Sequence, residues 1–421
     1  MLLIAAFFLI VRRGMTMAVG NKPLPHFACI QGLKIGVANA GVKQTQRPDV
    51  TVFELAEGAT IAGVYTTNAF CAAPVHICRK HSSEAATRFL LVNTGNANAG
   101  TGEAGFTTAM QCVEALAEKT ATSANQILPY STGVIGEPLP ADKIVASLDA
   151  AIADLCENNW PAAASAIMTT DTRPKGATCS IDVAGKRLNI SGISKGAGMI
   201  KPNMATMLSY VAMDAKASKP LLQQLLTDVN AKSFNRITID GDTSTNDSAM
   251  LIATAASELD LDSLSAEDLA TVKEALQALY IELAQLIIRD GEGANKFVHV
   301  EVLHAESEKE AERVAYAVAE SPLVKTALYA SDPNWGRILA AVGRAGVKGL
   351  DVNAIDIHIN GVLIAEKGGR AISYTEAAGA AEFAKEEIVI SIDLNRGAEE
   401  ATVWTSDLSI EYVRINAEYR T

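Results

Sequence analysis

Residues 195–213 read KGAGMIKPNMATMLSYVAM, and this stretch joins a cationic, glycine-rich loop to a buried strand. Gly196 and Gly198 permit backbone conformations that other residues avoid, so amide groups in the loop can converge on an anion beside two lysines. The apolar run 207–213 is typical of a buried strand. Thr206, directly before this run, is therefore predicted to sit where the strand begins.

The pair Ala205-Thr206 suggests that the chain cleaves itself. The Thr206 hydroxyl can attack the preceding carbonyl, convert the amide to an ester and release a chain that begins at Thr206. The new α-amino group has a pKa of about 8 and can act as general base for its own hydroxyl, so no histidine is needed. From the residues alone, the alternative is a glycine-rich turn that enters a core strand.

The run 195–208 resembles the cleavage segment of the ornithine acetyltransferase family, the bifunctional glutamate N-acetyltransferases of arginine biosynthesis. The resemblance extends over most of the chain, with the matching segments in the family's order. The further segments are VNTGNANAGTGEAG at 92–105, STGVIGEPLP at 131–140, MTTDTRPK at 168–175, DGDTSTNDS at 240–248 and DGEGANK at 290–296.

The resemblance implies a four-layer α/β/β/α sandwich, similar to N-terminal-nucleophile hydrolases, with a smaller C-terminal α+β subdomain. The residues themselves support a mixed α/β fold. Apolar runs within 33–66 predict strands, and 265–289 carries the apolar stripe of one long helix. Asn360-Gly361 predicts a hairpin between two strands, and residues 412–421 are predicted to end a strand.

No repeat or low-complexity linker divides the sequence, so a cut between Ala205 and Thr206 would split one folded unit. We expect an α chain of residues 17–205 and a β chain of residues 206–421, within which 296–421 forms the subdomain. The two chains should stay associated. The resemblance implies that they pair into an α2β2 assembly.

The first residues, 1–16, are interpreted as an extension outside the fold. They contain an apolar run, Leu2 to Val11, which is too short to cross a bilayer, and two arginines follow this run instead of preceding it as in a signal peptide. Because two methionines stand directly downstream, a start codon assigned too early explains the extension. A weak membrane anchor is the alternative.

The segment around Thr132 and Gly133 has no titratable side chain, so a catalytic role must come from hydroxyl and backbone N–H groups. Preset donors stabilise the negative oxygen that forms when a nucleophile adds to a carbonyl, and loss of one donor costs about 3 to 4 kcal/mol of barrier. The resemblance implies that Thr132 and Gly133 form this oxyanion hole. The residues alone leave a tight turn as an equal alternative.

The resemblance also implies a set of substrate-binding residues. Lys195 offers a cation to an amino acid carboxylate, and Glu292 offers a carboxylate to the amine of ornithine. The residues alone leave Glu292 as a solvated acid after a helix and Thr169 as part of a helix boundary. The full set is Thr169, Lys195, Thr206, Glu292, Asn416 and Thr421.

Composition and charge narrow the classes of partner. Of 421 residues, 49% are hydrophobic and 20% are charged, which is typical of a folded enzyme. The formal net charge of -12 argues against nucleic acid or an anionic membrane surface as partner. Six cysteines without a CxxC pair indicate a reducing cytoplasm. Neither the histidines nor the acidic loop 240–247 has the spacing of a metal site.

The implied function is ping-pong acetyl transfer in arginine biosynthesis. N2-acetyl-L-ornithine gives its acetyl group to Thr206, ornithine leaves, and L-glutamate collects the group, with no cofactor. Some members of the family also accept acetyl-CoA as donor, which this sequence leaves open.

Two rival interpretations come from other classes. A self-processing aminopeptidase or amidohydrolase of related fold is disfavoured by Thr206, where a serine would favour it, and by the MTTDT and GEG segments. A non-catalytic small-molecule binding protein is disfavoured by the intact Ala205-Thr206 pair.

Overall fold

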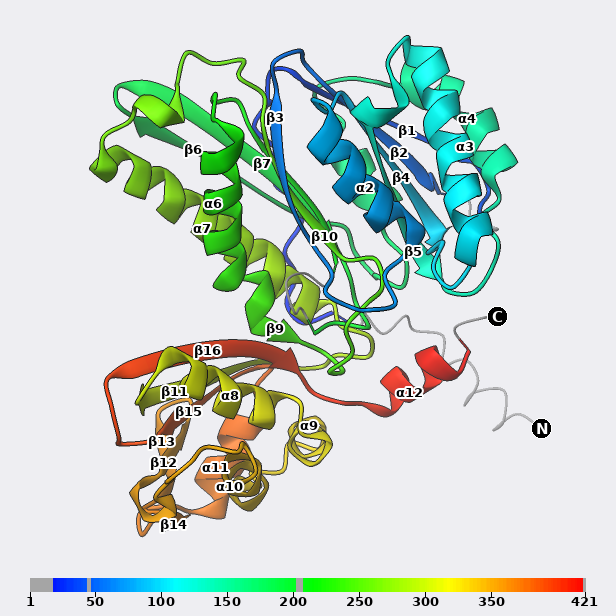
Figure 1. Cartoon of the computed structure of the whole chain (residues 1–421). Helices are drawn as coiled ribbons and strands as arrows, with labels where there is room; N and C mark the ends of the chain where they lie inside the picture. Colours follow the sequence, from blue (N-terminus) through cyan, green and yellow to red (C-terminus); the bar gives the residue numbers. More distant parts are fainter. Residues whose placement is uncertain (1–17, 44–46, 202–206, 419–421) are drawn as a thin grey trace, which may run out of the picture.

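Two sheets form the larger part of the molecule in the computed structural model, which describes residues 18–43, 47–201 and 207–418 (Figure 1). Neighbouring strands run antiparallel in both sheets except for β4 with β5 and β8 with β10, which are parallel. The first sheet has the order β1 (Leu33–Ala38), β2 (Val50–Leu55), β4 (Phe89–Asn96) and β5 (Ile127–Val134). The second has the order β3 (Thr60–Tyr65), β10 (Ser248–Ala253), β8 (Leu208–Met213), β7 (Lys186–Lys195) and β6 (Lys175–Val183).

The two sheets pack face to face over a shared apolar core. In β4, Leu90 and Val92 belong to the core between the sheets, whereas Leu91 belongs to the core on the opposite face. This alternation follows from the two-residue period of a strand. Aromatic rings join the sheets, since Phe53 of β2 and Tyr210 of β8 have ring centroids 4.9 Å apart. All six residues of β8 are buried, which explains why its sequence is apolar except for Ser209.

Helices cover the outer faces of both sheets (Figure 1). The helices α3 (Gly102–Thr120) and α4 (Ala141–Ala153) pack on the first sheet, and α6 (Lys219–Ala231) and α7 (Ala266–Arg289) pack on the second. The layers therefore run α/β/β/α, which confirms the predicted sandwich. Two further helices pack at its edges, α2 (Ala73–Glu84) beside β5 and α5 (Trp160–Ala166) beside β1 and β7.

The long helix predicted at 265–289 is confirmed as α7. Its N-terminus is capped by Ser265, whose Oγ accepts a hydrogen bond from the Asp268 N–H at 3.1 Å. Its apolar stripe is buried against the second sheet, with Val272, Leu276 and Leu283 in the core. The helix ends at a turn that leads to Glu292.

A third sheet follows, and it has an apolar core of its own (Figure 1). The hairpin predicted at Asn360-Gly361 is confirmed, and both residues have positive φ, 47° and 84°. The sheet has the order β14 (Gly369–Arg370), β13 (Val362–Glu366), β12 (Asp356–Ile359), β15 (Glu387–Asp393), β11 (Phe297–Ala305), β16 (Glu399–Ser406) and β9 (Ile237–Thr238). Its helices are α8 (Glu308–Ala319), α9 (Pro322–Tyr329), α10 (Trp335–Gly343) and α11 (Glu376–Phe383).

The strand predicted at the C-terminus is wrong, because the chain there forms helix α12 (Ile410–Ala417). Ser409 caps this helix by accepting a hydrogen bond from the Tyr412 N–H at 3.3 Å. After β16 the chain leaves the third sheet, and α12 lies below the end of β5 (Figure 1). This path brings the C-terminal segment to the sandwich.

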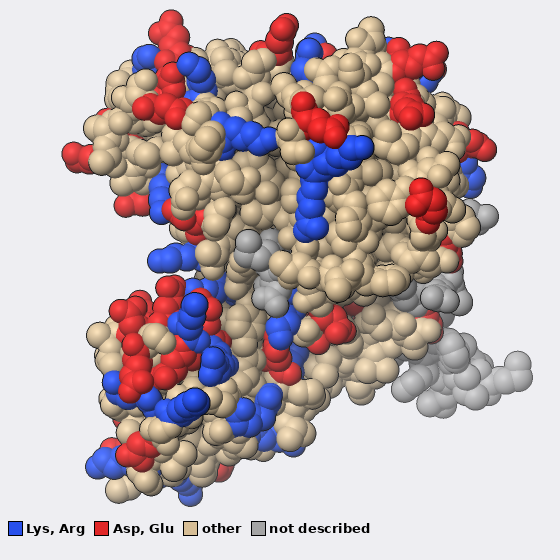
Figure 2. Space-filling model, viewed as in Figure 1, with Lys and Arg blue, Asp and Glu red and all other residues tan. Residues whose placement is uncertain are grey.

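Charged side chains of both signs are interspersed on the face shown in Figure 2. Within 18–43, 47–201 and 207–418, no helix is both long and apolar enough to span a membrane.

Candidate active site

The candidate site lies where strands of the two sandwich sheets end. Thr132 and Gly133 are near the end of β5, and Lys195 is the last residue of β7, paired with Leu208 at the start of β8. A cavity of about 280 Å³ lies between these strand ends. Of the residues predicted to act, the cavity brings together Thr132, Gly133, Thr169, Lys195, Glu292 and Asn416.

Three other predicted residues, Ala205, Thr206 and Thr421, lie outside the described residues. Met207, the residue after Thr206 in the chain, lines the cavity. Its carbonyl accepts a hydrogen bond from the Ser248 N–H at 2.8 Å, which joins the start of β8 to β10. The described wall of the cavity thus includes the immediate sequence neighbour of the predicted nucleophile.

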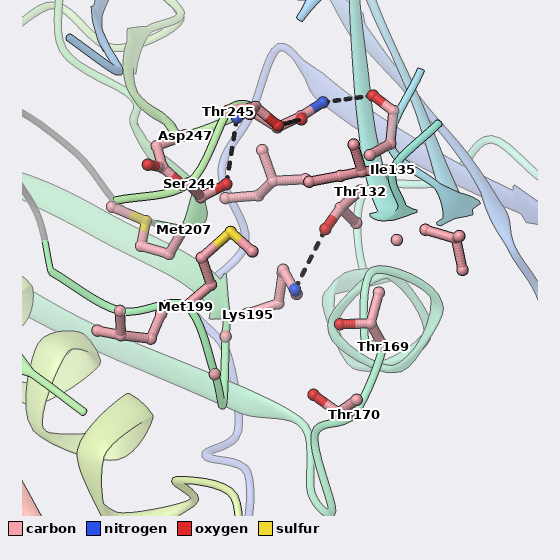
Figure 3. A pocket seen from close by; sticks show the side chains of 18 of the residues that line it. Thr132, Ile135, Thr169, Thr170, Lys195, Met199, Met207, Ser244, Thr245 and Asp247 are labelled. Atoms are coloured by element: carbon pink, nitrogen blue, oxygen red, sulfur yellow. Dashed lines mark hydrogen bonds between the residues drawn. The ribbon is translucent and has the colours of Figure 1, made fainter. Parts of the chain in front are cut away.

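Lys195 and Thr132 meet across the cavity from different sheets (Figure 3). The Lys195 Nζ donates a hydrogen bond to Thr132 Oγ1 at 3.2 Å. An ammonium group can only donate, so Thr132 accepts here and its own hydroxyl proton is free to point elsewhere. A hydroxyl held in this way can donate to a developing oxyanion.

Gly133 occupies a position that requires glycine. Its φ of +137° is rarely adopted by residues with a side chain, and a Cβ atom there would lie 2.3 Å from the carbonyl carbon of Gly95. The pairing of β4 with β5 shifts register beside this point, at Asn96. The close approach of the two strands therefore excludes any side chain and leaves the Gly133 backbone in the cavity wall.

Lys195 is almost wholly buried, and its surroundings set its charge. Burial lowers the pKa of its ammonium group, whereas nearby carboxylates, Asp171 first and then Asp247 and Glu292, counter the shift. Because this ammonium group is buried, few water molecules compete with a ligand for its hydrogen bonds. It is well suited to bind the carboxylate of an amino acid.

A buried ionic cluster fixes the loop that carries Thr169. Lys175 Nζ lies 2.5 Å from Asp171 Oδ1 and 2.5 Å from Asp290 Oδ2, and all three side chains are buried. Asp171 also accepts hydrogen bonds from the N–H groups of Thr169 at 2.9 Å and Gly196 at 2.8 Å. The cluster therefore ties this loop to the segment after β7 and to the end of α7.

Nearby positive charges counter the effect of burial on the pKa of Asp171. Burial alone would raise the pKa of Asp171, but Lys175 and Lys195 hold it below the usual range. The sequence indicated a charge-rich loop at 168–175, and its only signal for Asp290 was the family-like segment 290–296. Asp290 is 115 positions away from Lys175 in the chain, and only the fold brings them together.

Glu292 and Asn416 form another part of the cavity wall. The Asn416 Nδ2 donates a hydrogen bond to Glu292 Oε2 at 2.7 Å. Glu292 also packs so closely on Gly198 that a Cβ atom there would lie 2.6 Å from the Glu292 carboxyl carbon. This carboxylate is almost buried, and α12 supplies the amide that orients it.

Asp247 is a further cavity residue, to which sequence reasoning gave no role. It lies directly before β10, near Ser244 and Met207 (Figure 3). Burial raises its pKa well above the ordinary value, although Ser244 and Lys195 oppose the shift, and its Oδ2 has no hydrogen-bond partner among the described residues. Its position within the family-like segment 240–248 was the only signal in the sequence.

No group of His, Cys, Asp and Glu side chains in the described part of the chain could hold a metal ion. The six cysteines are free thiols.

Comparison with known proteins places this geometry in context. The profile of the ArgJ family matches residues 34–421. The arginine biosynthesis bifunctional protein ArgJ of Pseudomonas fluorescens (strain Pf0-1) is 58% identical over 406 residues, which cover 96% of this chain and 100% of the relative.

Two solved structures are also similar. ArgJ from Bacillus halodurans is 39% identical with a TM-score of 0.45, and the match covers 48% of this chain and 95% of that one. The ornithine acetyltransferase complexed with ornithine from Mycobacterium tuberculosis is 27% identical with a TM-score of 0.37, and the match covers 45% of this chain and 98% of that one.

Proposed function

The chain belongs to the ArgJ family, and from this premise we propose that it is a self-cleaving acetyltransferase that moves the acetyl group of N2-acetyl-L-ornithine to L-glutamate. The observation that carries the proposal is the hydrogen bond from Lys195 to Thr132 at 3.2 Å, in the cavity that Met207 lines. It combines a cation for a substrate carboxylate with a hydroxyl for an oxyanion. Thr206 precedes Met207 in the chain and is the proposed nucleophile.

The first half-reaction forms an acetyl-threonine ester. The Thr206 hydroxyl gives its proton to the α-amino group freed by cleavage after Ala205, and its oxygen adds to the acetyl carbonyl. Thr132 and the Gly133 N–H stabilise the negative oxygen of the tetrahedral intermediate. The amide C–N bond then breaks, the proton passes to the leaving amine, and ornithine departs.

The second half-reaction reverses these steps with glutamate. Its α-amine adds to the ester carbonyl, the C–O bond to Thr206 breaks, and the proton returns to the Thr206 oxygen. One amide is exchanged for a similar one, so the overall reaction needs no energy source. Glu292, oriented by Asn416, binds the side-chain ammonium of the donor, and Lys195 and Thr169 bind near the reacting end.

The wider assignments belong to the same proposal. The relative from Pseudomonas fluorescens is named bifunctional, which favours acetyl-CoA as a second donor for glutamate. Cleavage gives an α chain that ends at Ala205 and a β chain that begins at Thr206, and two copies of each form the assembly. Thr421 contributes to the substrate site. The free thiols suit the cytoplasm.

Product analysis tests the reaction class. The purified protein is incubated with acetylornithine and glutamate, and ornithine, acetylglutamate and free acetate are quantified. We expect ornithine and acetylglutamate in equal amounts from the wild type and neither from Thr206→Ala. Ornithine formed together with acetate, independently of glutamate, would instead identify an amidohydrolase. A parallel reaction with acetyl-CoA in place of acetylornithine tests the second donor.

A further inference from the structure

The proposed function requires the protein to bind two side chains of opposite charge, and the first cavity favours only one of them. Donor and acceptor are amino acids with oppositely charged side chains, an ammonium in ornithine and a carboxylate in glutamate. The carboxylate of Glu292 attracts the first and repels the second. The acceptor therefore needs a cation of its own, at a distance from Glu292.

A second cavity of about 270 Å³ adjoins the first. The two cavities share Gly133, Thr169 and Thr170 in their walls. Glu292 lines only the first, whereas Lys43 and Arg47 line only the second. A ligand that reacts beside Gly133 can thus extend its side chain in either of two directions.

Arg47 has donors available for an anion in the second cavity. Its Nη2 donates hydrogen bonds to the carbonyls of Met168 at 2.6 Å and Thr169 at 3.1 Å. Arg47 forms no ion pair with a carboxylate of residues 18–43, 47–201 or 207–418. A guanidinium carries five N–H donors, so this one can still bind a carboxylate.

Asp49, the acidic residue among the described residues of the second cavity, already accepts hydrogen bonds from the backbone. The two carboxylate oxygens of Asp49 accept hydrogen bonds from the N–H groups of Ala40 at 2.6 Å and Val42 at 2.7 Å. Lys43 is exposed at the cavity and adds a second positive charge. Among the described residues that line the second cavity, Arg47 and Lys43 are cations and Asp49 is the one carboxylate, so this part of the lining favours an anion.

We propose that the second cavity binds the side-chain carboxylate of the acceptor, glutamate, through Arg47, with Lys43 adding to the positive field. The α-amine of glutamate then lies beside Gly133, where the acetyl ester forms, and its side chain points away from Glu292. The proposal rests on the proposed function and assigns the two substrate side chains to separate cavities. It explains how one nucleophile serves a cationic donor and an anionic acceptor.

The test separates the two half-reactions with Arg47→Gln and Lys43→Gln. Exchange of isotope-labelled ornithine into acetylornithine, without glutamate, reports the donor half alone. Transfer to glutamate at varied concentration reports the acceptor half. We expect Arg47→Gln to raise the KM for glutamate about tenfold to a hundredfold, as for loss of a charged hydrogen bond, and by much more than it slows exchange. Lys43→Gln should have a smaller effect in the same direction.

Two comparisons sharpen the result. Glutamine as acceptor lacks the side-chain charge, so the preference for glutamate over glutamine should fall in Arg47→Gln and be partly restored in Arg47→Lys. Lys143→Gln is the matched control, because the Lys143 Nζ donates to the Gly41 carbonyl at 2.8 Å and contacts the same loop without lining the cavity. It should behave as the wild type.

Three outcomes would overturn the proposal. Equal losses of exchange and transfer in Arg47→Gln would show that Arg47 only positions Thr169. An unchanged KM for glutamate in both variants would exclude the cavity as the acceptor site. A raised KM for acetyl-CoA with an unchanged KM for glutamate would assign the cations to donor phosphates instead. Absence of exchange in the wild type would be different, since it would contradict the proposed function itself.

Discussion

At the scale of single residues, the hydroxyl of Thr132 is central to the proposed chemistry. It accepts a hydrogen bond from Lys195, which leaves its proton for the oxyanion. A threonine in the same cavity, Thr170, has no such bond to Lys195 and provides a matched comparison.

Thr132→Val removes the hydroxyl and keeps the shape of the side chain. We expect kcat to fall about a hundredfold to a thousandfold, as for loss of one oxyanion donor, with little change in KM. Steady-state kinetics of acetyl transfer measure this, with Thr170→Val as the control. Equal effects of the two substitutions would contradict a specific role for Thr132.

Asp247 gives a pH-dependent prediction. Because burial raises its pKa in the folded protein, the folded state retains a proton that the unfolded chain loses above about pH 4, so stability falls as pH rises through that value. Asp247→Asn carries no titrating group. The free energy of unfolding of Asp247→Asn, minus that of the wild type, should therefore increase between about pH 4 and about pH 7. Denaturant titrations at several pH values measure the difference, and a constant gap would contradict the account.

At the scale of elements, the ionic cluster of Lys175 joins the loop before β6, the segment after β7 and the end of α7. Lys175 balances two buried carboxylates, Asp171 and Asp290. Removing one member of such a group leaves uncompensated charge away from water.

Lys175→Met should lower the free energy of unfolding by about 3 to 5 kcal/mol. Lys119→Met is the control, because Lys119 pairs with Asp149 at 2.7 Å on the surface, where such a pair contributes about 1 kcal/mol or less. Chemical denaturation measures both. Because Lys175 helps to hold the pKa of Asp171 low, its contribution to stability falls as the pH falls, so acidification should narrow the loss of unfolding free energy in Lys175→Met. Similar losses of unfolding free energy in both variants would contradict a role of the cluster in stabilising the fold.

Local patterns predicted some elements and failed for others. The helix at 266–289 and the strand at 208–213 were predictable because an apolar stripe or a largely apolar run marks burial within one segment. The helix at 410–417 is short and has no fully buried residue, so its pattern favours neither a helix nor a strand. Its cap at Ser409 was the local signal that sequence reasoning missed.

At the scale of the whole molecule, the second sheet interleaves the two halves of the chain. In the order β3-β10-β8-β7-β6, strands β10 and β8 follow Thr206 in sequence and lie between strands that precede it. Local patterns do not reveal this order, because β3 pairs with β10 across more than half of the sandwich sequence. The site depends on the same long-range pairing. Local patterns therefore do not bring its residues together, and only the family resemblance predicts that they form one site.

This interleaving predicts that cleavage does not release the halves. The fragments should elute together in size-exclusion chromatography under native conditions and appear as two bands on a denaturing gel. The pairing of β7 with β8, from Ile190 with Met213 to Lys195 with Leu208, should hold them together. Separate elution of the fragments would contradict the expectation that both belong to one folded unit.

Intact mass spectrometry of the denatured protein tests the central claim most directly, before and after incubation with acetylornithine without glutamate. The account predicts two fragments that meet at Ala205 and Thr206, one added acetyl group on the fragment that begins at Thr206, and loss of that group when glutamate is supplied. A single uncut chain, or an acetyl group on the other fragment, would contradict it.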